Sequence, residues 1–214
     1  MGWSDLVDPV RLIGEIQKAF SAYQGTRIVA LGDTGVGKTT FWHYAQHNSP
    51  APVDLSRTAH VEQLGKFIAR DLDVMFVKQR VKAVDVPGHL WGTWEEAVRE
   101  ANPHGILFLC DHAEGFDKRD ISEDRLEAHK RAFLRVAEVI ESAQPKALKR
   151  LAVVVNKRDL WKGATSRVEL LHKSGIGSAL GSLSAGGKIA VTATDCSALY
   201  GENVKTTLAF LAGN

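Results

Sequence analysis

Residues 32–39 read Gly-Asp-Thr-Gly-Val-Gly-Lys-Thr, the full pattern G-x-x-x-x-G-K-[ST]. The glycines let consecutive backbone N–H groups turn into one concavity, and a following helix adds its partial positive charge. Lys38 is spaced to reach the β- and γ-phosphates, and the hydroxyl of Thr39 is spaced to bind Mg²⁺. An ordinary glycine-rich turn with a solvated lysine is the alternative. The apolar segment before the pattern and the helix-like segment after it favour a loop that binds a nucleoside triphosphate.

A second set of polar residues ends the segment 151–159, which reads Leu-Ala-Val-Val-Val-Asn-Lys-Arg-Asp. Ligands of open α/β sheets bind at the carboxyl ends of the strands. Guanine offers two adjacent donors to one carboxylate and adenine does not, so Asp159 predicts a preference for guanine. Asn156 is expected close to the base and the phosphate loop, and the stem of Lys157 is expected along the face of the ring. An isolated copy of this motif would be a surface turn; its place after a strand and the phosphate loop favours base binding.

Two shorter signals complete the set. Asp85-Val86-Pro87-Gly88 ends an apolar segment, so its carboxylate can hold Mg²⁺ through water and its glycine N–H can bond the γ-phosphate. His89 follows where a side chain that positions water belongs, with a surface histidine as the alternative. Cys196-Ser197-Ala198 follows another predicted strand and is similar to a short loop that offers backbone N–H groups to guanine O6.

With these four signals in this order, the chain resembles the Ras-like small GTPase superfamily. Its phosphate loop is similar to that of the Rab type. Its D-x-P-G-H motif is similar to that of translational GTPases, and its N-terminal helix is similar to that of Arf-like proteins. The resemblance implies an α/β fold: a three-layer P-loop G domain over residues 26–214, with a six-stranded, mostly parallel sheet and helices on both faces. Residues 1–25 would be an N-terminal amphipathic helical extension.

The resemblance also implies Mg²⁺ and GTP or GDP as cofactors, and it assigns roles to particular residues. His89 and Lys38 are the expected catalytic residues, and Thr39, Thr58 and Asp85 are the expected metal ligands. The segment between Thr58 and Asp85 is longer than the family norm. The expected nucleotide contacts are Gly32, Asp33, Thr34, Gly35, Val36, Gly37, Lys38, Thr39, Thr40, Gly88, Asn156, Lys157, Asp159, Ser197 and Ala198.

Strands and helices must position these residues, and the periodicity of the sequence predicts where those strands and helices lie. Apolar runs predict strands at 27–31, 81–86, 105–110, 151–155 and 188–193. Helices are predicted at 39–46, after Ser122 with an apolar face that includes Leu126 and His129, and at 203–211. Another helix is predicted before Gly175. The glycine- and serine-rich stretch 175–187 predicts a mobile connection.

Composition limits the function classes. The 214 residues are 44% hydrophobic and 24% charged, typical of one globular domain, and the net charge of +2 argues against a nucleic-acid surface. Two cysteines do not make a disulfide framework, and Cys110 is expected in the core. Neither a membrane span, a signal-peptide pattern nor a C-terminal prenylation cysteine is present, so a cytoplasmic location is expected.

The N-terminal extension carries an apolar stripe at helical spacing after Asp8-Pro9. We expect a helix that packs on this protein's own sheet or on a partner. The alternative is a helix released onto membrane when GTP binds, as in Arf-like proteins. Its few basic residues fit anionic lipid poorly, and Gly2 does not satisfy the myristoylation pattern. Membrane contact is therefore the less favoured reading.

Trp91 and Trp94 follow His89 in the predicted second switch. We expect them to form a docking surface for effector and regulatory proteins, because tryptophan is enriched at binding hot spots. Burial in the core is the alternative.

Four functions stay open at this point. The favoured one is a slow GTPase that acts as a molecular switch. The others are a GTP-binding scaffold with negligible hydrolysis, a ribosome-linked GTPase, and a P-loop ATPase or kinase. The oligomeric state is unknown from the sequence.

Overall fold

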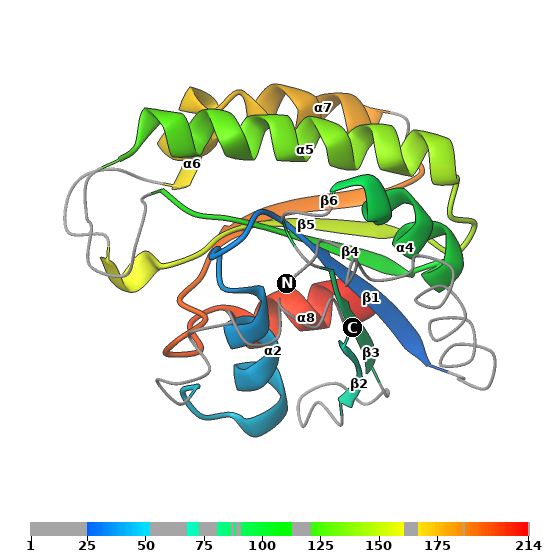
Figure 1. Ribbon diagram of the computed structural model, residues 1–214, viewed down its shortest axis with the longest axis horizontal. Coiled ribbons are helices and arrows are strands. Elements are labelled where there is room, and N and C mark those ends of the chain that lie inside the picture. The colour runs from blue at the N-terminus through cyan, green and yellow to red at the C-terminus, as the bar shows by residue number, and fades with distance from the viewer. Residues whose placement is uncertain are drawn as a thin grey trace, which may run out of the picture.

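A twisted sheet forms the centre of the protein, seen edge-on in Figure 1. The structure is a computed structural model, which describes residues 25–51, 68–72, 81–86, 88, 91–112, 121–160, 167–185 and 187–213. The strand order is β2-β3-β1-β4-β5-β6. The strands are β1 (Thr26–Leu31), β2 (Ile68–Leu72), β3 (Val81–Asp85), β4 (Gly105–Cys110), β5 (Arg150–Val155) and β6 (Ala190–Asp195).

Five of these strands run parallel to one another: β1, β3, β4, β5 and β6. The sixth strand, β2, pairs antiparallel with β3 at one edge of the sheet. The predicted α/β fold with a parallel sheet is therefore confirmed for five strands. β1, β4 and β5 are almost fully buried along their length, as expected for strands covered on both faces. The chain reverses its direction across the sheet at β1, and such switch points are where open α/β sheets bind ligands.

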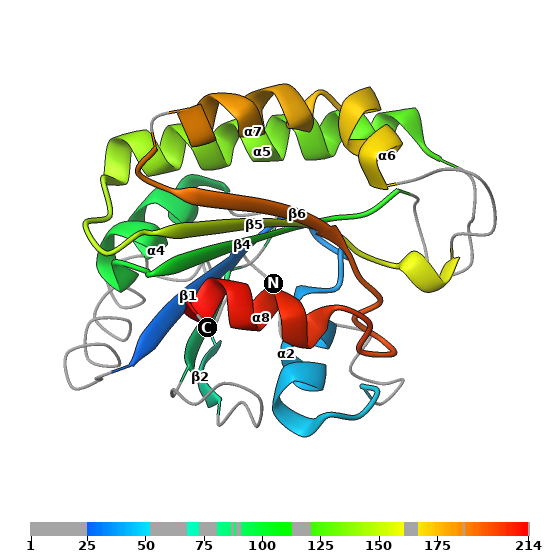
Figure 2. The ribbon, with the colours of Figure 1, turned by 180° about the vertical axis from the view of Figure 1, so that it is seen from behind.

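Helices cover both faces of the sheet (Figures 1 and 2). One face carries α2 (Lys38–His47) and α8 (Val204–Ala212), and the other carries α4 (Trp94–Ala101), α5 (Glu123–Ala143), α6 (Arg167–Lys173) and α7 (Ile176–Ala185). Two hydrophobic clusters result, one on each side of the strands. Two short 3-10 turns, η3 (Trp91–Thr93) and η4 (Arg158–Leu160), lie before α4 and after β5.

The long helix α5 begins at a specific capping residue. The Ser122 side chain accepts a hydrogen bond from the Arg125 backbone N–H at 3.2 Å, and Glu123 and Asp124 place negative charge in the first turn. The helix ends at Gln144, whose φ of 45° is left-handed. This cap fixes where α5 starts and therefore which of its side chains face the ends of β4 and β5.

Two sequence predictions are wrong. The stretch 175–187 was predicted as a mobile connection, but most of it forms α7, because Ile176 and Leu180 are buried against α5 and their packing outweighs the weak helix propensity of glycine and serine. Trp94 was predicted on a docking surface, but its side chain is fully buried in the core. Trp91 is half-buried and packs on it, with ring centroids 6.1 Å apart.

The N-terminal helical extension, residues 1–25, lies outside the described residues apart from Gly25, and Thr58, Pro87 and His89 lie outside them too. Within the described part of the chain, none of the helices combines the length and the apolar character that crossing a bilayer requires.

Candidate nucleotide-binding site

The loop 32–37 joins the buried end of β1 to the first turn of α2. Gly37 has φ of 92°, and a Cβ atom there would lie 2.3 Å from Asn156 Nδ2, so only glycine fits. Gly88 approaches the same loop from the end of β3, since a Cβ on it would lie 2.4 Å from the backbone N of Thr34. The glycine of Asp-x-x-G therefore lies directly against the phosphate loop. Val36 is fully buried, which anchors the middle of the loop in the core.

Lys38 and Thr39 begin α2 at this loop. The Lys38 side chain folds over the loop, and its Nζ donates to the carbonyl oxygens of Gly32 at 2.8 Å and Asp33 at 2.9 Å. The Thr39 hydroxyl donates to Asp85 Oδ2 at 2.9 Å. Two of the three predicted metal ligands are therefore neighbours, although they come from α2 and β3.

These two oxygens suit a hard cation such as Mg²⁺, which prefers oxygen ligands and keeps several waters. Among the described residues, no group of three or more histidine, cysteine, aspartate or glutamate side chains could hold a metal ion. The pair would therefore supply only part of a coordination shell. The remaining ligands would come from phosphate oxygens and water.

Asn156 connects the loop after β5 to the phosphate loop. Its Nδ2 donates to the Val36 carbonyl at 2.8 Å, and its Oδ1 accepts from the Ala198 N–H at 2.9 Å. The Cys196 thiol also donates to Oδ1, with Sγ and Oδ1 3.2 Å apart. Burial raises the pKa of this thiol, so it keeps its proton and stays a donor. One amide thus joins three segments of the predicted site.

Asp159 and Ser197 face each other at the outer end of this region. Ser197 Oγ lies 2.5 Å from Asp159 Oδ1, a short bond typical of a hydroxyl that donates to a carboxylate. Ser197 is fully buried, and its Oγ accepts from the Tyr200 N–H at 3.3 Å. The carboxylate that was predicted to accept from guanine is therefore held in one orientation by a buried hydroxyl.

Lys157 lies between these groups with a left-handed φ of 63°. Its Nζ forms an ion pair with Asp111 Oδ2 at 2.6 Å, and Asp111 ends β4 beside β5. This contact joins the loop after β5 to the end of β4. The position of the lysine stem beside a base stays a prediction.

Asp111 is a residue that the sequence analysis did not assign to the site, and its side chain is fully buried. Arg125 Nε donates to its Oδ1 at 2.7 Å, and His129 Nε2 lies 2.8 Å from the same oxygen. Burial alone would raise the pKa of the Asp111 carboxyl, but the hydrogen bonds from His129 and Arg125 and the charge of Lys157 hold that pKa well below its usual range. Asp111 is therefore a buried carboxylate surrounded by positive groups.

A sequence signal for this cluster did exist. Arg125 and His129 are four residues apart on a predicted helix, so they face the same direction, and Asp111 directly follows a predicted strand. The three were not connected because nothing in the sequence shows that α5 begins next to the end of β4.

The remaining predicted nucleotide contacts lie on or next to the phosphate loop. The Asp33 side chain accepts from the Thr34 N–H at 2.8 Å, so it caps its own loop. Thr34 is exposed, and Thr40 is half-buried on α2. Of the residues given a catalytic role, the structure describes Lys38 only, and of the expected metal ligands it describes Thr39 and Asp85.

No family model matches this sequence, and none of the curated proteins matches it. Among solved structures, the fold is similar to a bacterial selenocysteine-specific elongation factor, EF-Sec, at 17% sequence identity and a TM-score of 0.49. That similarity covers 88% of this chain and 29% of the elongation factor, so this chain spans less than a third of the length of that protein.

Proposed function

We propose that this protein is a small P-loop GTPase that binds GTP with Mg²⁺ and hydrolyses it to GDP as a switch of partner binding. One observation carries the proposal: Asn156 Nδ2 donates to the Val36 carbonyl at 2.8 Å across 120 residues of sequence. This bond joins the guanine-type motif to the phosphate-type loop, which supports a single site for both. A ligand with a guanine at one end and phosphates at the other matches both at once.

The phosphates would meet the loop 32–37 and Lys38. Backbone N–H groups and an ammonium group supply positive charge where the transferred phosphoryl group develops negative charge. Thr39 and Asp85 would hold Mg²⁺, which would supply positive charge to neutralise part of the phosphate charge. The contribution of the protein is therefore mostly positioning and electrostatics.

The base would meet Asp159 with its carboxylate oriented by Ser197, and Lys157 along one side. Guanine presents two adjacent donors to a carboxylate, whereas adenine would leave that carboxylate without them. Unsatisfied buried polar groups give strong discrimination. This arrangement supports GTP over ATP, and it opposes an ATPase or a kinase.

Turnover is the part of the proposal that depends on His89, which would orient the attacking water. We expect slow intrinsic hydrolysis that an activating partner raises by on the order of 10³–10⁵. Gly88 lies against the phosphate loop, so a change at the γ-phosphate would reach the following segment and Trp91. Partner binding through that segment would then follow the nucleotide state.

Calorimetry with Mg²⁺ and GTP, GDP or ATP tests nucleotide binding, on the wild-type protein and on Asp159→Ala. We expect the wild-type protein to bind guanine nucleotides only, and Asp159→Ala to lose that preference. Asp124→Ala is the matched control, because it removes an exposed carboxylate from the first turn of α5. Equal affinity for ATP, or no nucleotide binding, would contradict the proposal.

Single-turnover hydrolysis then separates a switch from a scaffold. A wild-type rate above that of free GTP, lowered in His89→Ala without a change in GTP affinity, supports the switch. Binding without any acceleration would leave a GTP-binding interaction protein.

A further inference from the structure

Arg125 reaches the phosphate loop from the first turn of α5. Its Nη2 donates to the Thr34 carbonyl at 3.0 Å, and the two residues are 91 positions apart in the sequence. Nothing in the phosphate-loop pattern itself requires this contact. It is made because the Ser122 cap starts α5 beside the loop.

The geometry of a peptide group gives this contact a consequence. No described peptide bond is cis, and in a trans peptide the C=O and the N–H point in opposite directions. The carbonyl of Thr34 and the N–H of Gly35 belong to the same peptide. When Arg125 holds the carbonyl on its side, it fixes the N–H on the other side. The left-handed φ of Gly35, 77°, then continues the turn of the loop.

Asp111 keeps the Arg125 side chain in place. The guanidinium donates Nε to Asp111 Oδ1 at 2.7 Å and Nη2 to Oδ2 at 3.3 Å, and it still has a hydrogen to reach Thr34. A planar fork with five donors can hold a carboxylate and a carbonyl together, whereas a lysine ammonium on a flexible stem does so poorly. The same carboxylate binds Lys157 of the base region. Asp111 and Arg125 thus connect the two ends of the site.

We propose that Arg125 is a positioning residue for phosphate binding: held by Asp111, it orients the Thr34–Gly35 peptide so that the Gly35 N–H faces a nucleotide phosphate. This inference rests on the proposed function, since it needs a nucleotide in the site. Asn156 does the same for the Val36–Gly37 peptide through its bond to the Val36 carbonyl. Two alternate peptides of the loop are then held from outside, one from α5 and one from the loop after β5.

A purely structural role for Arg125 makes a different prediction. If Arg125 only neutralised the buried Asp111, its replacement would loosen the fold near β4 and weaken base and phosphate binding together. A positioning role concerns the phosphates alone. Guanosine, which has the base and no phosphate, separates the two roles when it is compared with GDP.

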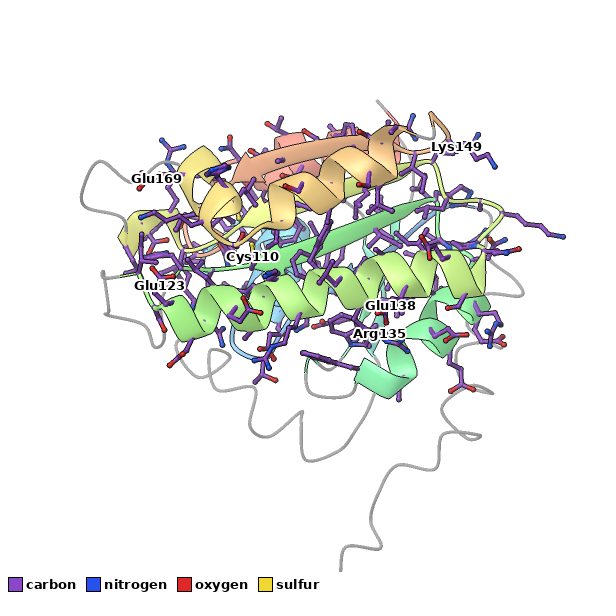
Figure 3. The ribbon with its side chains drawn as sticks, turned by 90° about the horizontal axis from the view of Figure 1, so that it is seen from above. Cys110, Glu123, Arg135, Glu138, Lys149 and Glu169 are labelled. Atoms are coloured by element: carbon purple, nitrogen blue, oxygen red, sulfur yellow. The ribbon has the colours of Figure 1, made fainter. Side chains whose placement is uncertain are left out.

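The experiment uses Arg125→Lys, which keeps a positive charge beside Asp111, and Arg125→Gln, which removes it. Arg135→Lys is the matched control, because Arg135 lies farther along α5 (Figure 3) and pairs with Glu138 at 2.9 Å. GDP binding is measured by calorimetry, guanosine binding by NMR titration, and thermal unfolding without nucleotide for each protein.

We expect Arg125→Lys to weaken GDP binding on the order of tenfold, the effect of one charge-assisted hydrogen bond. Guanosine binding stays the same, and the melting temperature changes no more than in Arg135→Lys. Arg125→Gln loses at least as much GDP affinity. Unchanged GDP affinity, or equal losses for GDP and guanosine, would overturn the inference alone. A wild-type protein that does not bind GDP would overturn the proposed function together with it.

Discussion

The phosphate end of the candidate site consists mainly of backbone, whereas the base end consists of side chains that already bind one another. At the phosphate end, Gly37 makes room for a neighbouring amide, and Lys38 donates to two loop carbonyls. At the base end, Ser197 binds Asp159, and Asn156 binds the segment of Cys196 and Ala198.

Under the proposed function, this difference is how each end would encode its specificity. Phosphate binding needs N–H groups that every residue except proline has, so the sequence must specify glycines that allow the required path. Base recognition needs particular donors and acceptors, so the sequence must specify side chains and the partners that orient them. Nucleotide binding should therefore be sensitive to substitutions that add side-chain atoms at the phosphate end, and to substitutions that remove side-chain atoms at the base end.

The largest expected effect is at Gly37. Alanine there would add a Cβ 2.3 Å from Asn156 Nδ2 at a φ of 92°. We expect Gly37→Ala to abolish detectable binding of GDP, because the substitution displaces Asn156 and distorts the loop, and the left-handed backbone alone costs about 1–2 kcal/mol. Calorimetry with GDP measures the loss, and urea unfolding measures the stability.

Gly181→Ala is the control for this substitution. Gly181 lies on α7 with no atom within 4 Å of an added Cβ, so alanine should raise stability by roughly 0.5–1 kcal/mol. Its GDP affinity should stay that of the wild-type protein. Binding retained by Gly37→Ala would mean that the loop tolerates added atoms, and the comparison between the two ends would fail.

Asp111 joins the two ends, and its effect should be intermediate. Its folded-state pKa is held below its unfolded value of about 4, so the stability that it contributes is present above that pH and is lost as the pH falls through the folded pKa. Asp111→Asn should lower the free energy of unfolding by about 3 kcal/mol at pH 7, because a buried charged partner is removed. The difference in the free energy of unfolding between Asp111→Asn and the wild-type protein should narrow below about pH 4.

Urea unfolding of both proteins from pH 7 down to pH 3 measures that gap. Asp124→Asn is the control. It removes an exposed carboxylate from the first turn of α5 and shows what a surface charge contributes to the free energy of unfolding. A gap that stays constant over the whole pH range would contradict the role given to Asp111.

Sequence patterns predict the structure best where they are local. The continuous apolar run of β4 matches its prediction residue for residue, and the helix after the phosphate loop differs from its prediction by a single residue at each end. Asp159 and Ser197, predicted separately from two motifs, lie within hydrogen-bond distance. Motifs predict well which residues lie together because each is confined to one strand end and its loop.

Sequence patterns fail to predict the structure where tertiary packing decides it. Glycines and serines in α7 suggested a mobile segment, and only the core beneath Ile176 and Leu180 explains the helix. Trp94 could not be assigned to the core from its position after a predicted switch. The contact of Arg125 with Thr34 depends on where α5 starts relative to β1, which no spacing in the sequence contains.

The smallest expected effect is at Ser197, and it tests the base end most directly. Ser197→Ala removes the hydroxyl 2.5 Å from Asp159 Oδ1, so the carboxylate loses the donor that orients it. We expect the affinity for GDP to fall by about 1 kcal/mol, roughly fivefold, with a smaller preference for GTP over ATP. Competition calorimetry with GDP, GTP and ATP measures both quantities.

Ser174→Ala is the matched control, because it removes a buried hydroxyl that bonds the Leu171 carbonyl at 3.0 Å after α6. It should lower the free energy of unfolding by about 1 kcal/mol, the contribution of one hydrogen bond, and leave the affinity for GDP unchanged. If both variants bound GDP as the wild-type protein does, Asp159 would not need its partner. The base end would then depend, like the phosphate end, on the path of the backbone, because the loop after β5 would orient the carboxylate without the hydroxyl.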